Sequence, residues 1–183
     1  MNKTLALQHS LIVAALMALP LAQAATMARP DYTAAKSRLS ADYKADKAAC
    51  NAMTANAKDI CVQEAKAKEK VARAELEFSY TGKPTDQNKI MVAKAESTYA
   101  IAKEKCDDMK GNEKDVCVKQ AKAVEVKSLA DAKMGKQITE AKTDASQDKR
   151  DADYKVAAEK CDAMSGDAKS SCVAAAKLKF GKS

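Results

Sequence analysis

The feature of this sequence that most constrains its fold is a cysteine-containing segment that occurs three times without gaps. The copies are residues 43–66 (YKADKAACNAMTANAKDICVQEAK), 99–122 (YAIAKEKCDDMKGNEKDVCVKQAK) and 154–177 (YKVAAEKCDAMSGDAKSSCVAAAK). They share the pattern Y-x6-C-[DN]-x-M-x2-[ND]-x-K-x2-C-V-x2-A-K and recur at a nearly constant interval, as their first residues Tyr43, Tyr99 and Tyr154 show. Such self-similarity predicts that the chain is built from equivalent supersecondary units.

Each copy predicts two helices joined by a short turn. Tyr, the first Cys and Met stand at i, i+7 and i+10, which is one face of a helix, so we expect all three to pack in a core. Gly111 and Gly166 come five residues after the first Cys, where a left-handed helix C-cap would lie. The next residues are preferred at helix N-caps, and they are Asn56, Asn112 and Asp167. Because Ala55 replaces the glycine in the first copy, its turn is expected to be strained or differently shaped.

The repeat also predicts how the six cysteines pair. Six cysteines allow 15 connectivities, but equivalent units favour the local one, which joins Cys50 to Cys61, Cys106 to Cys117 and Cys161 to Cys172. Helix axes pack about 8–10 Å apart, which brings facing Cα atoms into the range that a disulfide spans. Closing a loop of about 12 residues contributes on the order of 3 kcal/mol of stability.

Two linkers separate the repeats, and both are rich in Ala, Lys, Glu and Gln, which favour helix. Gly82-Lys83-Pro84-Thr85-Asp86 predicts a helix end and a new start in the first linker. Gly135-Lys136-Gln137 lies in nearly the same place of the second linker but lacks the proline, so a kinked continuous helix is an alternative there. We therefore predict an all-α fold of three disulfide-clipped antiparallel hairpins, about six helices of roughly 20 residues each, as an elongated bundle or a short helical array.

The content of large apolar residues is low for a folded chain. From Ala25 onward, alanines clearly outnumber Leu, Ile, Val and Phe taken together. Closely packed alanine helices bury little area each, so disulfides, helix propensity or self-association must supply the remaining stability. Disorder is the competing interpretation of this composition.

Residues 1–24 resemble a secretory signal peptide. Lys3 gives the positive start, residues 11–19 (LIVAALMAL) give the apolar segment, and Ala22-Gln23-Ala24 is an A-x-A cleavage site. We therefore expect residues 25–183 to form a single all-helical repeat domain, with no transmembrane segment in the mature chain. An even number of cysteines in an exported protein predicts disulfides, and the short signal favours the bacterial periplasm.

The residue types argue against catalysis and against metal or cofactor binding. His9, the only histidine, lies in the predicted signal peptide, which excludes a Ser-His-Asp triad, a Cys-His pair and a histidine-ligated metal in the mature chain. C-x10-C is neither a redox C-x2-C nor zinc-ligand spacing, and residues 106–112 lack the register of a calcium loop. Haem ligation by the repeat methionines would lack a histidine partner. We expect no catalytic residues, no metal and no cofactor.

The net charge of +7 raises one alternative. The lysines are interspersed with Asp and Glu, which is typical of a solvated helix face rather than of a nucleic-acid-binding stripe. A basic exported protein can still bind lipopolysaccharide, anionic lipid or nucleic acid. Only the C-terminal run of residues 177–182 (KLKFGK) lacks a nearby acid in sequence.

The segment CDDMKGNEKDVCVKQAKA, residues 106–123, resembles a motif of small exported helical proteins of Gram-negative bacteria. Some of these carry the label cell-envelope biogenesis or TolA-like, a likeness that rests on Ala/Lys/Glu-rich composition. The resemblance implies a location in the cell envelope and no particular activity. It is consistent with a non-enzymatic structural or protein-interaction role, with another envelope protein or a second copy of the chain as partner and no specific nucleic acid.

Overall fold

The fold of residues 27–182 is described by a computed structural model, and the predicted signal peptide lies outside the described residues. The chain forms α1 (Arg29–Ala49), a short 3-10 turn η1 (Cys50–Ala52), α2 (Ala55–Thr81), α3 (Pro84–Cys106), α4 (Gly111–Asp162) and α5 (Gly166–Phe180). No strand occurs within these residues. The predicted all-α class with three disulfide-clipped hairpins is confirmed.

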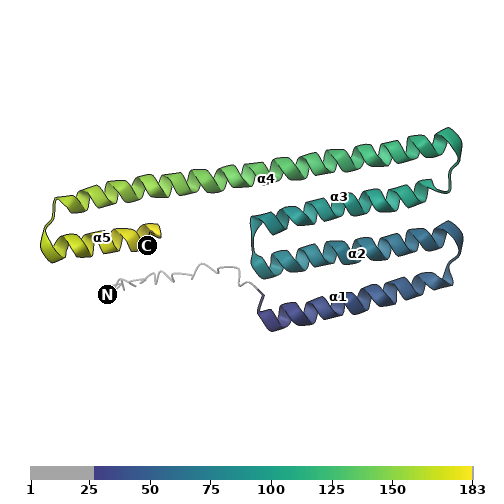
Figure 1. The fold of residues 1–183 in the computed structure, drawn as a ribbon, viewed down its shortest axis with the longest axis horizontal. Coiled ribbons are helices and arrows are strands. Elements are labelled where there is room, and N and C mark those ends of the chain that lie inside the picture. The colour runs from purple at the N-terminus through teal and green to yellow at the C-terminus, as the bar shows by residue number, and fades with distance from the viewer. Residues whose placement is uncertain (1–26, 183) are drawn as a thin grey trace, which may run out of the picture.

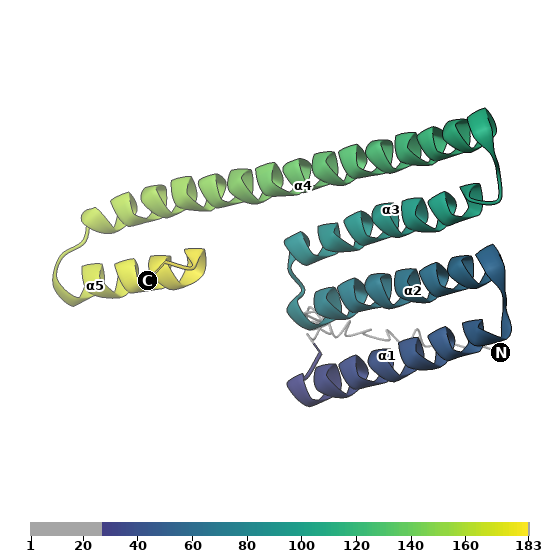
Figure 2. The same ribbon diagram turned by 45° about the vertical axis from the view of Figure 1, so that its right-hand side comes forward.

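The helices lie side by side in a single layer (Figures 1 and 2). Helices α1, α2 and α3 run antiparallel in chain order beneath the first half of α4, and α5 folds back beneath the second half of α4. Within residues 27–182, each α-helix packs only against the helices next to it in the chain. Among the described helices, the layer is therefore one helix thick, and no other helix covers either face.

The structure contains five α-helices in its described part rather than about six, because the second linker does not break. In the first linker, Gly82 adopts a left-handed conformation with φ 64° and ends α2, and Pro84 begins α3. Gly135 stays inside α4, which runs unbroken for 52 residues, about 78 Å at about 1.5 Å per residue. Gly135 also lies close to α3, since a Cβ atom built on it would lie 3.3 Å from Cε of Met91.

The helix contacts bury small residues. The buried apolar set is made mainly of alanines and of the first cysteine of each repeat, and it includes one large aliphatic residue. Its members are Cys50, Ala65, Leu76, Ala93, Ala95, Cys106, Ala132, Cys161 and Ala176. Since alanines allow helices to approach closely but bury little area each, additional contacts at the helix ends matter for this fold.

At the helix ends that no disulfide joins, polar and aromatic contacts hold neighbouring helices together. At the open end of the first hairpin, the Tyr32 ring stacks on Tyr80 at 4.4 Å between centroids. The hydroxyl of Tyr32 donates a 2.7 Å hydrogen bond to Glu77, and this bond raises the pKa of Tyr32. Nothing in the repeat pattern marks residues 32 and 80 as partners, so the contact cannot be predicted from the sequence.

The turn between α2 and α3 is held by a buried carboxylate. Asp86 is 4% exposed and accepts a hydrogen bond from Oγ1 of Thr81 at 2.5 Å. Its other oxygen lies 2.7 Å from Nζ of Lys89. The hydrogen bonds from Lys89, which has the larger effect, and from Thr81 lower the pKa of Asp86. This carboxylate therefore joins the end of α2 to the first turn of α3.

Candidate functional site: the disulfide-clipped turns

The structure brings all six predicted cysteines together in the predicted pairs. Cys50–Cys61, Cys106–Cys117 and Cys161–Cys172 are disulfides, with Cα–Cα distances of 5.6, 5.7 and 5.7 Å. The first two lie at the same end of the layer and the third at the opposite end of α4 (Figure 1). Each clips consecutive helices close to the turn between them.

The three turns share one backbone geometry. In each, the N–H of the repeat methionine donates to the carbonyl of the first cysteine, at 3.1, 3.0 and 3.0 Å for Met53, Met109 and Met164. An extended residue follows, and the next residue has a left-handed φ of 51° at Ala55, 55° at Gly111 and 57° at Gly166. Ala55 therefore adopts the same conformation as the glycines. Because a left-handed conformation brings Cβ close to the backbone, the expected strain is present in the first turn.

The N-caps of the second helices differ from the prediction. They are Thr54, Lys110 and Ser165, because the left-handed residue is itself the first residue of each helix. Asn56 does not cap α2. Its side-chain Nδ2 donates a 2.9 Å hydrogen bond to the backbone carbonyl of Glu104 at the end of α3. This residue therefore links the first hairpin to the second.

The expectation that the repeat methionines pack in a core is wrong. Met53, Met109 and Met164 are 46%, 43% and 47% exposed. The first helix of each hairpin ends at or next to the cysteine, so the methionine lies in the turn, where the helical spacing no longer determines its direction. The repeat tyrosines remain on the helices and are half-buried.

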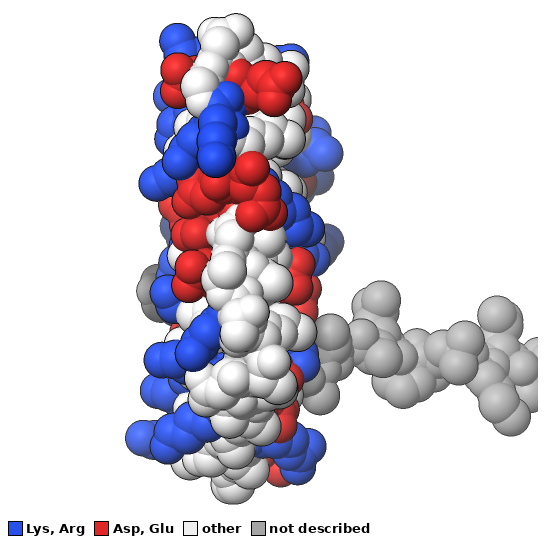
Figure 3. All heavy atoms as spheres, turned by 90° about the vertical axis from the view of Figure 1, so that its right-hand side faces the viewer, with Lys and Arg blue, Asp and Glu red and all other residues white. Residues whose placement is uncertain are grey.

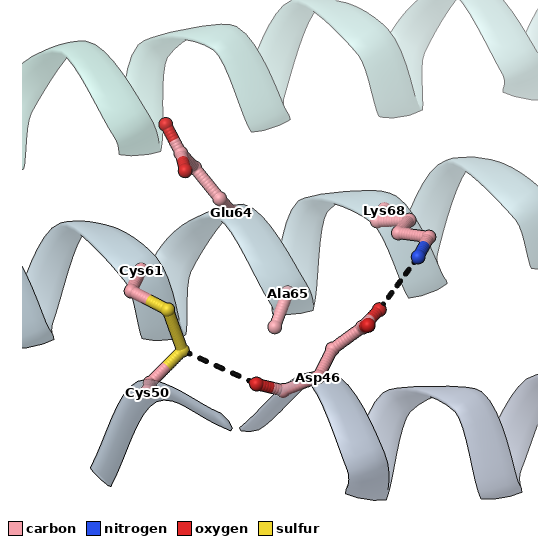
Figure 4. Close-up of a pocket in the computed structure, with 6 residues that line it drawn as sticks. All are labelled: Asp46, Cys50, Cys61, Glu64, Ala65 and Lys68. Atoms are coloured by element: carbon pink, nitrogen blue, oxygen red, sulfur yellow. Dashed lines mark hydrogen bonds and ion pairs between the residues drawn. A yellow bond between two sulfur atoms is a disulfide. The ribbon is translucent and has the colours of Figure 1, made fainter. Parts of the chain in front are cut away.

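Beside the first disulfide, α1 and α2 leave a shallow groove of about 240 Å³. Figure 4 shows the sulfur bridge at one end and the ion pair between Lys68 and Asp46 at the other, with Nζ and Oδ2 2.8 Å apart. The hydrogen bond from Lys68 to Asp46 raises the pKa of the lysine. Ala65 forms the floor, and Glu64 points from α2 toward α3. The groove is small and charged, and its lysine and one of its two carboxylates neutralise each other.

The two cysteines of each bridge differ in exposure. The first cysteines, Cys50, Cys106 and Cys161, are 0%, 0% and 1% exposed, whereas the second cysteines are half-buried. The first sulfur is closed to a thiolate reductant, so attack has to fall on the second, and a buried thiolate would have to leave. Burial in apolar surroundings raises a thiol pKa and makes it a poor leaving group. This arrangement favours a stable structural bond over thiol–disulfide exchange.

Many lysines near the turns and along the helices are paired with acids. Eleven ion pairs occur among the described residues. The pair between Lys68 and Asp46 joins α1 to α2. Three others join α2 to α3, and they are Lys70–Glu96, Lys94–Glu75 and Lys105–Glu64. Figure 3 shows the layer from the end with the first two disulfides, as a narrow slab that carries both basic and acidic side chains with uncharged ones between them. Opposite charges therefore cancel over short distances on this end of the molecule.

The C-terminal run has an acid close in space although it has none close in sequence. Nζ of Lys182 lies 2.5 Å from Oδ1 of Asp151 on α4, and this contact lowers the pKa of Asp151. A second pair, Lys169–Asp162 at 2.9 Å, joins the start of α5 to the end of α4. The prediction that the run is a basic segment without acid partners is therefore wrong at Lys182.

Among residues 27–182, no group of three or more His, Cys, Asp or Glu side chains is arranged to hold a metal ion. In the same range, no helix combines the length and the apolarity needed to cross a membrane. Three disulfides are typical of proteins from oxidising compartments. No protein-family model, curated protein or solved structure matches the chain.

Proposed function

We propose that this chain is a non-enzymatic structural or protein-interaction protein of the cell envelope, exported to the periplasm by an N-terminal signal peptide that is cleaved after residue 24. The observation that carries the proposal is the single layer of helices, in which each helix packs only on its chain neighbours within residues 27–182. Such a layer presents a large surface for its mass. Disulfides at three turns keep this surface in place although little apolar area is buried.

The test is crosslinking in intact cells that produce the protein, followed by affinity capture and mass spectrometry. We expect one envelope protein, or the chain itself, to be recovered repeatedly. The control is the same chain without residues 1–24, which should remain in the cytoplasm with its cysteines reduced and lose that partner. Recovery of the full chain from the cytoplasm with residues 1–24 intact would contradict the proposal.

The alternative is lysine-mediated binding of an anionic surface such as lipopolysaccharide, anionic lipid or nucleic acid. Its support is the basic net charge, which is +7 for the full chain including Lys3 of the signal peptide, and the ion pairs described above reduce that support. Interleaved charges cancel beyond a Debye length of about 8 Å at physiological salt. Retention on heparin should therefore be weak and end by about 150 mM salt, since polyanion binding depends on counterion release. Retention that survives physiological salt would favour the alternative.

A further inference from the structure

The outer side of α4 is the longest free edge of the layer. Both α3 and α5 pack on the same side of α4 (Figure 1), and the buried residues Glu125, Ala132 and Cys161 mark this inner side. Because successive residues of a helix are rotated by about 100°, positions on the opposite side follow from these three. That outer side has no neighbouring helix among the described residues.

Four large apolar residues lie along this outer edge. Val116, Met134, Ile138 and Val156 are 44%, 56%, 48% and 56% exposed. Val116 and Met134 are 18 residues apart, and so are Ile138 and Val156. This interval is about five whole helical turns of about 3.6 residues, so the members of each pair lie on the same side of the helix. Because α4 is straight (Figures 1 and 2), the four side chains form one stripe. All the exposed alanines of α4 also lie on this side, and they are Ala123, Ala130, Ala141, Ala145 and Ala152.

We propose that a second copy of this chain docks on this edge, with the two α4 helices antiparallel about a two-fold axis near residue 136. In this register Val116 of one copy lies opposite Val156 of the second copy, and Met134 lies opposite Ile138. Each copy contributes the same four residues, so the interface is self-complementary and closes as a dimer. The stripe from Val116 to Val156 is about 60 Å long.

Charge complementarity supports this register. Between Val116 and Val156, two charged residues interrupt the stripe, and they have opposite signs, Lys127 and Asp148. In the proposed register Lys127 lies about one helical turn from Asp148 of the second copy, about 4.5 Å along the axis. A lysine side chain spans this offset. The two-fold axis creates the pair twice, so each interrupting charge gains a partner.

The rim of the interface is mixed in charge. On one flank, Asp131 would face Lys142 of the second copy, whereas Glu113 would lie near both Lys160 and Glu159 of the second copy. On the other flank Lys119 would lie near Lys155 of the second copy, a like-charged contact that solvent and salt screen at an exposed rim. Exposed pairs contribute little energy but select one alignment over others.

The docking also continues the packing that the chain already uses. Within the layer, antiparallel helices contact each other through alanines and a few larger residues. Two α4 edges joined in the same way would extend the layer from α1 of one copy to α1 of the second. The inference names a partner for the proposed structural role. Only the biological meaning of the dimer rests on that role, and the dimerisation itself does not. Dimerisation is measured with pure protein, so it can fail or hold independently of the test in cells.

Sedimentation equilibrium of the oxidised full chain measures the dimerisation. We expect a monomer–dimer equilibrium, with the dissociation constant raised at least tenfold by the double substitution Val116→Asp and Val156→Asp. The matched control is Val126→Asp, because Val126 is 55% exposed on the same helix but lies about a quarter of a turn away from Val116. A protein that stays monomeric at high concentration, or an equal effect of the control, would overturn the proposal.

Charge reversal tests the register independently. Lys127→Asp alone and Asp148→Lys alone should each weaken the dimer, because each places like charges together twice. The combined variant should regain dimerisation close to that of the unmodified chain. Additive weakening in the combined variant would show that the two residues do not meet.

Crosslinking tests the direction of pairing. Separate Val116→Cys and Val156→Cys chains, mixed with a short bismaleimide, should form a covalent dimer, while either chain alone should not. The native cysteines are protected as disulfides. Crosslinking of the Val116→Cys chain to itself would indicate parallel pairing and overturn the proposed register.

Discussion

Ala55 and Gly111 occupy the same position in two equivalent turns and have nearly the same left-handed backbone conformation, with φ of 51° and 55°. A left-handed conformation costs a residue with a Cβ atom about 1–2 kcal/mol, a cost that glycine does not have. The disulfide and the hydrogen bond from Met53 to Cys50 hold the first turn in this shape. The repeat thus imposes one geometry even where the residue does not favour it.

Ala55→Gly should therefore stabilise the protein. The relief of about 1–2 kcal/mol is partly offset by the greater freedom of glycine in the unfolded chain, which costs about 0.4–1 kcal/mol. We expect a net gain of up to about 1 kcal/mol in the free energy of unfolding, measured by urea denaturation. The control, Ala57→Gly two residues into α2, should destabilise by a similar amount. A loss of stability in Ala55→Gly would contradict the assigned strain.

Loss of the third disulfide should release α5 selectively. Helix α5 has 15 residues and packs only on α4 within the described chain, and isolated helices of this length are marginal in water. In the variant Cys161→Ser with Cys172→Ser, amide protection in residues 166–180 should disappear while α2 and α3 stay protected. The matched variant Cys106→Ser with Cys117→Ser should keep α4 on α3, because that interface is longer. Equal loss of protection in both variants would argue against this difference.

Gly135→Ala should stabilise α4. Replacing a helix-interior glycine by alanine gains up to about 1 kcal/mol. The new Cβ would meet only Cε of Met91, at 3.3 Å, and the end of a flexible side chain can move by a few tenths of an ångström. We expect a higher melting temperature with unchanged helical circular dichroism. A lower melting temperature would mean that Met91 cannot adjust or that Gly135 has to bend.

The Asp86 carboxylate should make the turn between α2 and α3 sensitive to acid. Its pKa in the folded protein is lowered by Lys89 and Thr81, so its contribution is present above the ordinary Asp value of about 3.9. This contribution is lost as the pH falls from there through the lower folded pKa.

The variant Asp86→Asn removes this titration. The melting temperature of Asp86→Asn should be lower than that of the unmodified chain at pH 7, and the gap should narrow below about pH 4. Asp31→Asn is a control in which the carboxylate also lies in a first helical turn. A gap for Asp86→Asn that stays constant from pH 7 to pH 3 would contradict the assigned role.

The elements that the repeat determines could be predicted from the sequence. The prediction was incomplete where a residue has two permitted conformations. The pairing of the cysteines follows from three equivalent copies, and the structure confirms it. Gly135 was ambiguous, because a glycine can end a helix or lie within one. The absence of proline and the close contact with Met91 decide for a continuous helix.

Two further differences come from contacts between elements that are distant in sequence. Asn56 has the chemistry of an N-cap, but its side chain donates a hydrogen bond to the backbone carbonyl of Glu104 in the neighbouring hairpin instead. Lys182 has no acid nearby in sequence, but Asp151 lies beside it once α5 folds back on α4. A single sequence contains no signal for either pairing, because each depends on how two helices are placed.

The restriction of helix contacts to chain neighbours has a consequence for the order in which this protein forms. No described helix must wait for a distant part of the chain, so contact order is low and folding is expected to be fast. Each disulfide joins cysteines only 11 positions apart, so loop closure favours the native partner over cysteines of other repeats. A chain that emerges N-terminus first can therefore complete and lock one hairpin before the next repeat is available to compete for its cysteines.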